Sequence, residues 1–326
     1  MRQFLGQLVD GDAVDSVFVA ADKQLRANRN GQPFIQIDLR DRSGGLIGRM
    51  WNAGETHFRS FEIGDYLRVR GKVQHYQGAL QMIVTGFDRV EAAAVDPAEF
   101  LPEADGDCAK RLDRLKTLVR SVGDMHLRAL VEAFLADDQF LNELCLCPAG
   151  VKNHHAYLGG LLEHVVTLLE GVDRLAPLYP SVNRDLWMIG IFLHDIGKVR
   201  ELCYRQSFGY SDDGQLVGHL IQGVEMLEEK ISKAVELTGE TFPSELRLRL
   251  RHIIVSHHGE YEFGSPKLPM TLEAVAVNVL DNLDAKLNTA AREIKEDRGE
   301  NSWTQYNPGL QRRFFKGACE SEENQN

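Results

Sequence analysis

Hydrophobic and polar residues alternate with a period of two over most of the first third of the chain, which is typical of strands buried on one face. In residues 34–40, for example, Ile35, Ile37 and Leu39 share one face. A possible helix over residues 53–61 separates the third such segment from the fourth. The alternating segments are residues 14–20, 34–40, 46–51, 67–73 and 80–84. This order predicts a closed barrel of five short strands.

From residue 109 onward, the apolar spacing changes to that of amphipathic helices. Apolar residues recur at offsets 0, 4, 7, 11 and 14 between Leu161 and Leu175, and at offsets 0, 4, 7 and 11 between Leu220 and Ile231. Tyrosine, phenylalanine and an Asp-Gly pair in residues 203–215 indicate a small hairpin or loop. The remainder of this part is expected to be all-helical.

Charge divides the chain at the same place. Residues 1–92 carry 12 Lys/Arg and 11 Asp/Glu, a net charge of +1, whereas the remainder carries 25 and 37, a net charge of −12. The small residues and two prolines between these parts are typical of a connector. The predicted organisation is a multidomain α and β chain: a barrel domain at 1–92, a linker at 93–107, a helical domain at 108–318 and a polar tail at 319–326.

Composition narrows the protein class. The 326 residues are 43% hydrophobic and carry a net charge of −11, so the chain can bury a packed core and disorder is excluded. The five cysteines have no C-x-x-C spacing, which argues against a disulfide framework and a thiolate zinc site. No apolar run approaches the roughly 20 residues of a membrane span, and no secretory signal is visible. We expect a cytoplasmic protein without a membrane partner.

The barrel segment carries candidate nucleic-acid-binding residues. Phe34, Arg49 and Trp51 are expected on the outer face, where bases can stack on rings and guanidinium planes, and Arg68 and Arg70 add positive charge on a neighbouring strand. The stretch from residue 32 to residue 51 resembles the OB-fold family. Two alternatives stay open: the aromatic rings cover a domain interface, and the strand arginines form a solvated face.

Histidines and aspartates gather in the helical part. Eight of the eleven histidines fall between residues 154 and 258, and His194 and Asp195 end the apolar run 187–193. A buried carboxylate needs a partner or a cation, although an isolated Asp195 could simply cap a turn. His164, His257 and Asp281 lie at or near inward helical positions. Several imidazoles and two carboxylates at inward positions favour a metal site.

These residues resemble a known signature. His164, His194, Asp195 and Asp281, in this order on helices, are similar to the His…His-Asp…Asp set of the HD superfamily of metal-dependent phosphohydrolases. The additional residues that resemble the further ligands of two-metal members are His219, His257 and His258. Segments 154–164, 256–259, 262–266 and 281–286, together with the preceding barrel, resemble the YhaM-type 3′-to-5′ exoribonucleases.

The resemblance implies roles for individual residues. Asp195 would bridge two ions, one shared with His164, His194 and Asp281. The other ion would be held by His219 and His257, with His258 as a further candidate. Lys198 would place its ammonium against the phosphoryl oxygens, unless it faces solvent. His154 and His155 could contact substrate or be structural.

Imidazole and carboxylate ligands without thiolate suit Mn²⁺, Co²⁺, Fe²⁺ or Mg²⁺, and we expect two ions, with Mn²⁺ preferred. The leading hypothesis is a metal-dependent 3′-to-5′ exonuclease that hydrolyses single-stranded RNA, with single-stranded DNA as a further substrate, through a hydroxide activated by two metals. A homo-oligomer is compatible with the sequence. The alternatives are a phosphohydrolase of a small nucleotide with a regulatory barrel and a non-catalytic nucleic-acid-binding adaptor. A cyclic-dinucleotide substrate is disfavoured because no Gly-Tyr-Pro follows His258.

Overall fold

The computed structural model contains two compact units, which we describe separately. One unit comprises Met1–Pro102, Arg205–Ser207 and Thr289–Asn326, and the other comprises Glu103–Tyr204 and Phe208–Asn288. This division groups residues 289–326 with the barrel segment, and the sequence-based domain boundaries stay predictions. The residues that the structure describes are 2–28, 30–76, 79–96, 99–100, 107–151, 155–204, 208–297, 299, 301–307 and 310–317.

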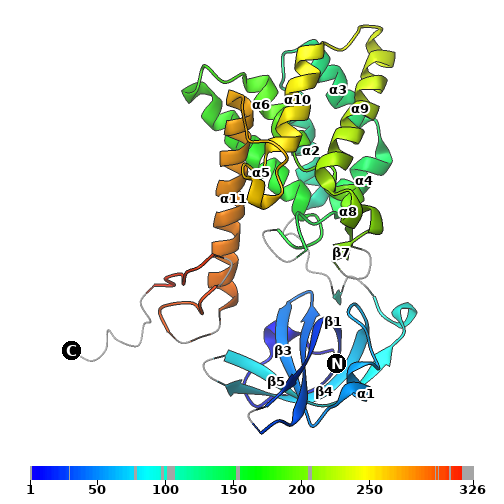
Figure 1. The fold of residues 1–326 in the computed structure, drawn as a ribbon, viewed down its shortest axis with the longest axis vertical. Helices are drawn as coiled ribbons and strands as arrows, with labels where there is room; N and C mark the ends of the chain where they lie inside the picture. Colours follow the sequence, from blue (N-terminus) through cyan, green and yellow to red (C-terminus); the bar gives the residue numbers. More distant parts are fainter. Residues whose placement is uncertain are drawn as a thin grey trace, which may run out of the picture. The chain divides into compact units, whose positions relative to one another are not determined.

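The N-terminal segment forms a closed five-stranded barrel in the strand order β1-β2-β3-β5-β4, as the alternating pattern predicted (Figure 1). All neighbouring strands pair antiparallel except β3 and β5, which run parallel. A one-turn helix follows the third strand, at the predicted position. The elements are η1 (Leu5–Gln7), β1 (Ala13–Ala27), β2 (Pro33–Asp41), β3 (Gly44–Trp51), α1 (Glu55–Phe58), β4 (Tyr66–Tyr76), β5 (Ala79–Val90) and η2 (Ala92–Ala94).

Alternation along β2 builds the interior of the barrel. Ile35, Ile37 and Leu39 are fully buried in one hydrophobic cluster with residues from the other strands. In the register of β2 with β3, Phe34 lies directly opposite Trp51 on the other face. The predicted division of this strand into an apolar and an outer face is confirmed.

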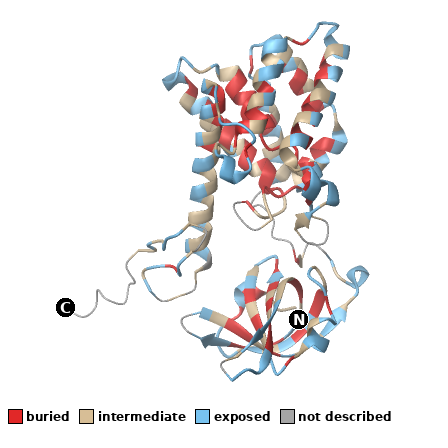
Figure 2. Ribbon diagram, viewed as in Figure 1, coloured by how far each residue is buried: buried red, intermediate tan, exposed pale blue. Residues whose placement is uncertain are grey.

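The second unit consists mainly of helices around one hydrophobic core, in agreement with the 3.6-residue spacing (Figure 2). The central helix is α6, in which every residue from Leu186 to Leu193 is buried. The elements are α2 (Cys108–Val119), α3 (Met125–Leu135), α4 (Asp138–Leu146), α5 (Gly160–Leu175), η4 (Ala176–Leu178), α6 (Arg184–Leu193), α7 (Lys198–Glu201), β6 (Leu202–Cys203), β7 (Gly209–Tyr210), α8 (Asp212–Leu216), α9 (His219–Thr238), α10 (Ser244–Ser256), η5 (Tyr261–Phe263) and α11 (Leu272–Glu296).

Local sequence fixes the boundaries of α6, the helix that leads into the His-Asp pair. The side chain of Asn183 accepts a hydrogen bond from the amide of Leu186 and so caps the first turn. At the other end, the chain continues through His194 as a tight turn into α7, and β6 then pairs antiparallel with β7. The hairpin or loop predicted over residues 203–215 thus contains the short pairing of β6 with β7, and α8 begins within the same range. Among the helices of the described residues, none is both long and apolar enough to cross a membrane.

Candidate metal centre

The predicted ligands come from five helical elements and meet in one place. α5 supplies His164 from its buried stripe, and the turn after α6 supplies His194 and Asp195. α9 begins at His219, α10 ends just before His257 and His258, and α11 supplies Asp281. His164, His194, Asp195 and His257 are at most 2% exposed, so the centre lies inside the unit. Residues spread over more than a hundred positions are thus brought together.

Asp195 lies between two sets of imidazoles. Its Oδ2 is 3.3 Å from Nε2 of His194 and 3.9 Å from Nε2 of His164. Its Oδ1 is 3.3 Å from Nε2 of His257 and 3.6 Å from Nε2 of His219. This Oδ1 atom is buried and has no hydrogen-bond partner among the residues that the structure describes. A buried carboxylate oxygen without a donor is costly unless a cation satisfies it, so the arrangement fits a metal ligand.

The two sets are completed by residues on the flanks. Oδ1 of Asp281 lies 3.2 Å from Nε2 of His164 and 3.9 Å from Nε2 of His194. On the other side, Nε2 of His258 lies 3.1 Å from Nε2 of His219. Three groups of these residues could each hold an ion, because the ligand atoms within a group lie within 4.8 Å of one another. The groups are His164, His194 and Asp195; His194, His257 and Asp281; and His219, His257 and His258. Every predicted ligand belongs to at least one of these groups.

The opposite ring nitrogen of each histidine is held by an acceptor. Nδ1 of His194, His257 and His258 contacts the backbone carbonyls of Ile191, Ile254 and Phe263 at 2.7, 2.8 and 2.8 Å. Nδ1 of His164 lies 2.8 Å from Asp284, and Nδ1 of His219 lies 3.0 Å from Glu201. In the neutral ring, such partners favour the tautomer in which Nδ1 carries the proton, so Nε2 is the nitrogen that faces the centre. All five rings are therefore oriented as metal ligands.

Charge at the centre is balanced by Lys198. Its Nζ donates to Oδ2 of Asp195 at 2.6 Å and to the carbonyl of Ala149 at 2.7 Å, so the side chain does not face solvent. Burial raises the pKa of Asp195, but Lys198 and the neighbouring histidines outweigh it and hold that pKa well below its usual value. The carboxylate is therefore ionised.

The imidazoles differ in proton affinity. Burial lowers the pKa of His257 to about 4. Burial also opposes protonation of His164, yet its hydrogen bonds with Asp281 and Asp284 prevail and raise the pKa of His164 to about 9. The carboxylates around His164 thus favour a positive charge at this position, which is what a site for cations requires.

Comparison with known proteins identifies the family. The HD domain model matches residues 161–286, and the OB-fold nucleic acid binding domain model matches residues 19–90. The protein named 3′-5′ exoribonuclease YhaM from Bacillus subtilis (strain 168) is 33% identical over 87% of this chain and 88% of its own length. Its namesake from Listeria monocytogenes serotype 4b (strain CLIP80459) is 31% identical over 94% of this chain and 95% of its own length. The chain belongs to the YhaM family.

Membership in the YhaM family confirms the predicted fold class and the prediction that the chain is a hydrolase. The HD domain makes it a metal-dependent enzyme, and the His/Asp groups described above lie within the matched residues or directly beside them. The sequence prediction of a nucleic-acid-binding barrel agrees with the OB-fold match. The number of ions and the role of each residue go beyond these findings.

Two carboxylates of the centre were not singled out from the sequence. Oδ2 of Asp284 contacts both Nδ1 of His164 and Nε2 of His155, at 2.8 and 2.9 Å. Glu201 accepts from the backbone amide of His219 and contacts its ring nitrogen, each at 3.0 Å. The position of Asp284, one helical turn after Asp281, was a usable signal, because residues three apart share a helix face. No comparable signal in the sequence pointed to Glu201.

His155 lies beside the centre of this YhaM-family chain, and His155, His164 and Asp284 form a further group whose ligand atoms could hold an ion. It is 4% exposed, its Nε2 contacts Asp284, and its backbone amide donates to the side chain of Asn288 at 3.0 Å. Its backbone has φ of 48°, a conformation that costs free energy in a residue other than glycine and that clusters at functional sites. His154 lies outside the described residues.

A close backbone contact brings α7 and α9 together beside Asp195. A Cβ atom on Gly197 would lie 2.0 Å from the carbonyl oxygen of His219 and 2.7 Å from the amide nitrogen of Gly223. Gly197 has an ordinary helical φ of −62°, so only the lack of a side chain is required here. This contact sets the position of His219 relative to Asp195.

The structure modifies the expected binding face of the barrel. Phe34 lies on the outer face with Trp51, as expected, but it is only 9% exposed because its ring packs against that of Trp51, with the ring centroids 4.8 Å apart. Trp51 is 41% exposed and presents the accessible ring of the pair. The guanidinium of Arg49 lies 5.7 Å from the ring centroid of Tyr76 and is partly buried.

The two strand arginines of the barrel are already paired. Arg68 binds Asp15 through two hydrogen bonds of 2.7 and 3.0 Å, and Arg70 donates to Asp88 at 2.8 Å. Both pairs are solvent-exposed, so each contributes little to stability and can be exchanged at low cost. Their predicted role in binding nucleic acid stays a prediction.

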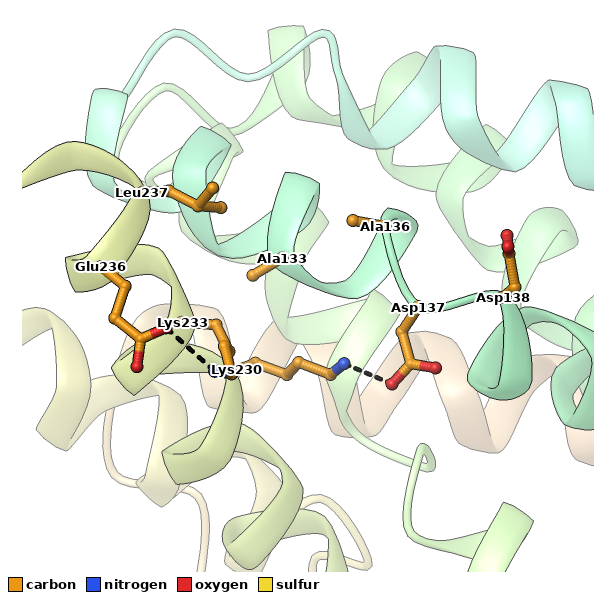
Figure 3. Close-up of a pocket in the computed structure, with 8 residues that line it drawn as sticks. All are labelled: Ala133, Ala136, Asp137, Asp138, Lys230, Lys233, Glu236 and Leu237. Atoms are coloured by element: carbon orange, nitrogen blue, oxygen red, sulfur yellow. Dashed lines mark hydrogen bonds and ion pairs between the residues drawn. The ribbon is translucent and has the colours of Figure 1, made fainter.

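A separate hollow between α3, α4 and α9 has no connection with this chemistry (Figure 3). Its two lysines are neutralised within the hollow, because Lys230 donates to Asp137 at 2.6 Å and Lys233 donates to Glu236 at 2.9 Å. None of the metal-centre residues lines it.

Proposed function

We propose that this chain is a metal-dependent 3′-to-5′ exoribonuclease that removes nucleotides from single-stranded RNA. The observation that carries this proposal is the arrangement around Asp195. Four imidazoles place Nε2 within 3.9 Å of this buried carboxylate, His258 lies beside one of them, and Oδ1 of Asp195 has no hydrogen-bond donor among the described residues. The relatives named 3′-5′ exoribonuclease YhaM support both the substrate and the direction of degradation.

Two divalent cations fit the donor set, and we propose Mn²⁺ as the preferred ion, with Co²⁺, Fe²⁺ and Mg²⁺ as substitutes. Oδ2 of Asp195, His164, His194 and Asp281 would hold one ion. Oδ1 of Asp195, His219, His257 and His258 would hold the other. When bound, such ions lower the pKa of water and neutralise charge on the phosphoryl oxygens.

The residues around the ligands orient them. Lys198 holds Oδ2 of Asp195 in place and brings a positive charge into the centre, which also favours the approach of a phosphate. Asp284, backed by His155, fixes the ring of His164, and Glu201 fixes the ring of His219. These contacts leave the Nε2 atoms prepared for metal binding, without side-chain rearrangement during the reaction.

The barrel would hold the single strand. Trp51 offers an exposed ring for a base, with Phe34 stacked behind it, and Arg49 lies beside it on the same strand. Arg68 and Arg70 can exchange their carboxylate partners for phosphates because both pairs are exposed. Stacking does not depend on the sugar, so we propose single-stranded DNA as a second substrate. An RNA-degrading activity of this kind fits the cytoplasmic location expected from the sequence.

A ladder assay tests the activity directly. The purified chain, stripped of metal and supplied with Mn²⁺, is incubated with a 5′-labelled single-stranded oligoribonucleotide. The proposal predicts shortening one nucleotide at a time from the 3′ end, dependence on added metal, and inhibition by a 3′-terminal phosphate that blocks the end. An oligomer that stays intact with Mn²⁺, or that is cut internally, contradicts the proposal.

An Asp195→Ala variant separates the three functions considered. An exonuclease should lose hydrolysis in this variant while retaining strand binding, because the barrel is distant in sequence from the metal ligands. A small-nucleotide phosphohydrolase would instead turn over a nucleotide from a metabolite panel faster than the oligomer. An adaptor would bind the strand and hydrolyse nothing in either form.

A further inference from the structure

A small hairpin follows α11 and belongs to neither family match. The matches end at residues 90 and 286, whereas the hairpin spans the described residues from 297 to 317. Isolated bridges pair Trp303 with Phe315 and Asn307 with Arg312 in antiparallel fashion. The amide of Thr304 donates to the carbonyl of Phe314 at 2.9 Å. The chain therefore has a defined structure here, with no role given by the metal centre or the barrel.

Polar contacts inside the hairpin hold its backbone. Asp297 accepts hydrogen bonds from Nζ of Lys316 at 2.7 Å, from the amide of Gln305 at 2.9 Å and from the amide of Gly299 at 2.9 Å. The hydroxyl of Thr304, a residue that is 3% exposed, accepts from the amide of Phe314 at 2.9 Å. The charge of Lys316 is therefore paired inside the hairpin, and the large aromatic and arginine side chains face outward.

The outward side chains are aromatic and basic. Trp303, Tyr306 and Phe315 are 52%, 54% and 56% exposed, and the rings of Trp303 and Phe315 lie 5.2 Å apart at an angle of 53°. Arg312 and Arg313 are also exposed. Residues 297–317 carry four basic and two acidic residues, a net charge of +2 in a chain whose total is −11. Exposed rings beside guanidinium groups are an interaction surface and not a core.

We propose that this hairpin is a second binding site for single-stranded RNA, separate from the barrel. Trp303 and Phe315 provide ring faces for unstacked bases, and Arg312 and Arg313 contact the phosphates. The local positive charge favours RNA over an apolar protein partner. An apolar partner would remove two guanidinium groups from water without offering them a negative charge, which is unfavourable. The proposal rests on the proposed function only in the identity of the ligand, because binding at the hairpin requires no hydrolysis.

Binding is measured by fluorescence anisotropy of a labelled oligoribonucleotide with the full chain in EDTA, where no RNA is consumed. Trp303→Leu keeps the bulk of the side chain and removes the ring face, and it should weaken binding by about 5- to 100-fold, the loss expected for one stacked base. Trp303→Phe should retain most of the affinity. Tyr179→Leu, which removes a ring that is 54% exposed in the helical unit, is the matched control and should leave the affinity within two-fold.

The arginines are tested by salt dependence. The double variant Arg312→Gln, Arg313→Gln should reduce the slope of log affinity against log salt by about 1.4, because each phosphate that an arginine neutralises on a single strand accounts for about 0.7 of that slope. Both side chains are exposed, but Nε of Arg312 donates to the carbonyl of Leu310 at 2.9 Å. Arg313→Gln alone, with an expected change of about 0.7 in the slope, is therefore the variant that spares this contact and reports the interaction with phosphates.

Each outcome has a distinct meaning. Wild-type chain that fails to bind the oligomer contradicts the proposed function and the hairpin site together. Wild-type binding that Trp303→Leu and the arginine double variant both leave unchanged contradicts the hairpin site alone. A third outcome is that the variants change the oligomeric state or the binding of another protein but leave RNA affinity unchanged. This outcome would show that the hairpin is a protein contact and would overturn the proposal.

Discussion

His164 offers Nε2 to the metal centre because its Nδ1 is engaged by Asp284. That carboxylate is in turn held by Nε2 of His155, so three side chains act as one unit. Partners of this kind keep a ligand ring in its productive orientation before any ion is bound. At the scale of single residues, the centre therefore depends on side chains beyond the seven proposed ligands.

The Asp284→Asn variant tests this dependence. An asparagine at this position can turn its NH₂ toward Nδ1 of His164, which favours the tautomer with the proton on Nε2 and blocks that ligand atom. We expect metal affinity to fall by about 10- to 100-fold, with exonuclease activity restored at high Mn²⁺. The measurement is a Mn²⁺ titration of activity. Asp113→Asn, at an exposed position of α2, is the control, and equal titration curves for the two variants would contradict the role of Asp284.

Proton release provides a test of His164. Its pKa of about 9 means that the metal-free ring is protonated at pH 7.5, so metal binding through Nε2 must displace about one proton. The contribution of His164 to metal affinity should therefore rise with pH and level off above about pH 9. Calorimetry in two buffers of different ionisation enthalpy counts the protons at pH 7.5. Identical heats in the two buffers would show that His164 does not ligate.

The sequence predicted the ligands better than their supports. His164 and Asp281 lie beside apolar residues of their helices, His194 and Asp195 end an apolar run, and the four residues occur in a known order. Glu201 gives no such signal, since its contact with His219 depends on how α7 meets α9. Phe34 was placed on the correct face, but the pattern could not predict that the ring of Trp51 covers it.

At the scale of elements, the contact between α7 and α9 decides how one half of the centre is built. Gly197→Ala would place a methyl group 2.0 Å from the carbonyl oxygen of His219, which forces the start of α9 away from Asp195. We expect a loss of about 1–3 kcal/mol in the free energy of unfolding, together with weaker metal binding. Denaturant unfolding can be followed by the fluorescence of Trp187, which is buried in the helical core.

Gly209→Ala is the matched control for this substitution. No heavy atom would lie within 4 Å of the added methyl group, so its effect on stability should stay within about 0.5 kcal/mol. If both variants unfold alike and retain the same metal content, the packing of α7 on α9 does not position His219.

Periodicity predicted the existence and type of most elements, because apolar spacing follows directly from burial on one face of a strand or helix. Element lengths were predicted less well: β1 continues to Ala27, although the alternation was visible only over residues 14–20. Pairing with β2 along this stretch supplies the hydrogen bonds that extend it. Such pairing comes from the tertiary structure and leaves no mark on the pattern of the strand itself.

At the scale of the whole molecule, an acidic chain that binds RNA must keep its positive charge local. Asp15 and Asp88 neutralise the two strand arginines of the barrel. Asp15→Asn should free Arg68 and strengthen RNA binding several-fold at low salt, and Arg68→Gln should weaken it, with the salt slope falling by about 0.7. Anisotropy titrations at several salt concentrations measure both effects. Unchanged affinity in both variants would leave Arg68 as part of a solvated strand face.

We propose that seven side chains from one chain hold a pair of divalent ions, with Asp195 between them. The most direct measurement is the metal content of the chain after reconstitution with Mn²⁺ and removal of free ions, compared between wild type and Asp195→Ala. We expect two Mn²⁺ per wild-type chain and less than one in the variant. Wild-type chain without bound metal, or a variant that retains both ions, would contradict it.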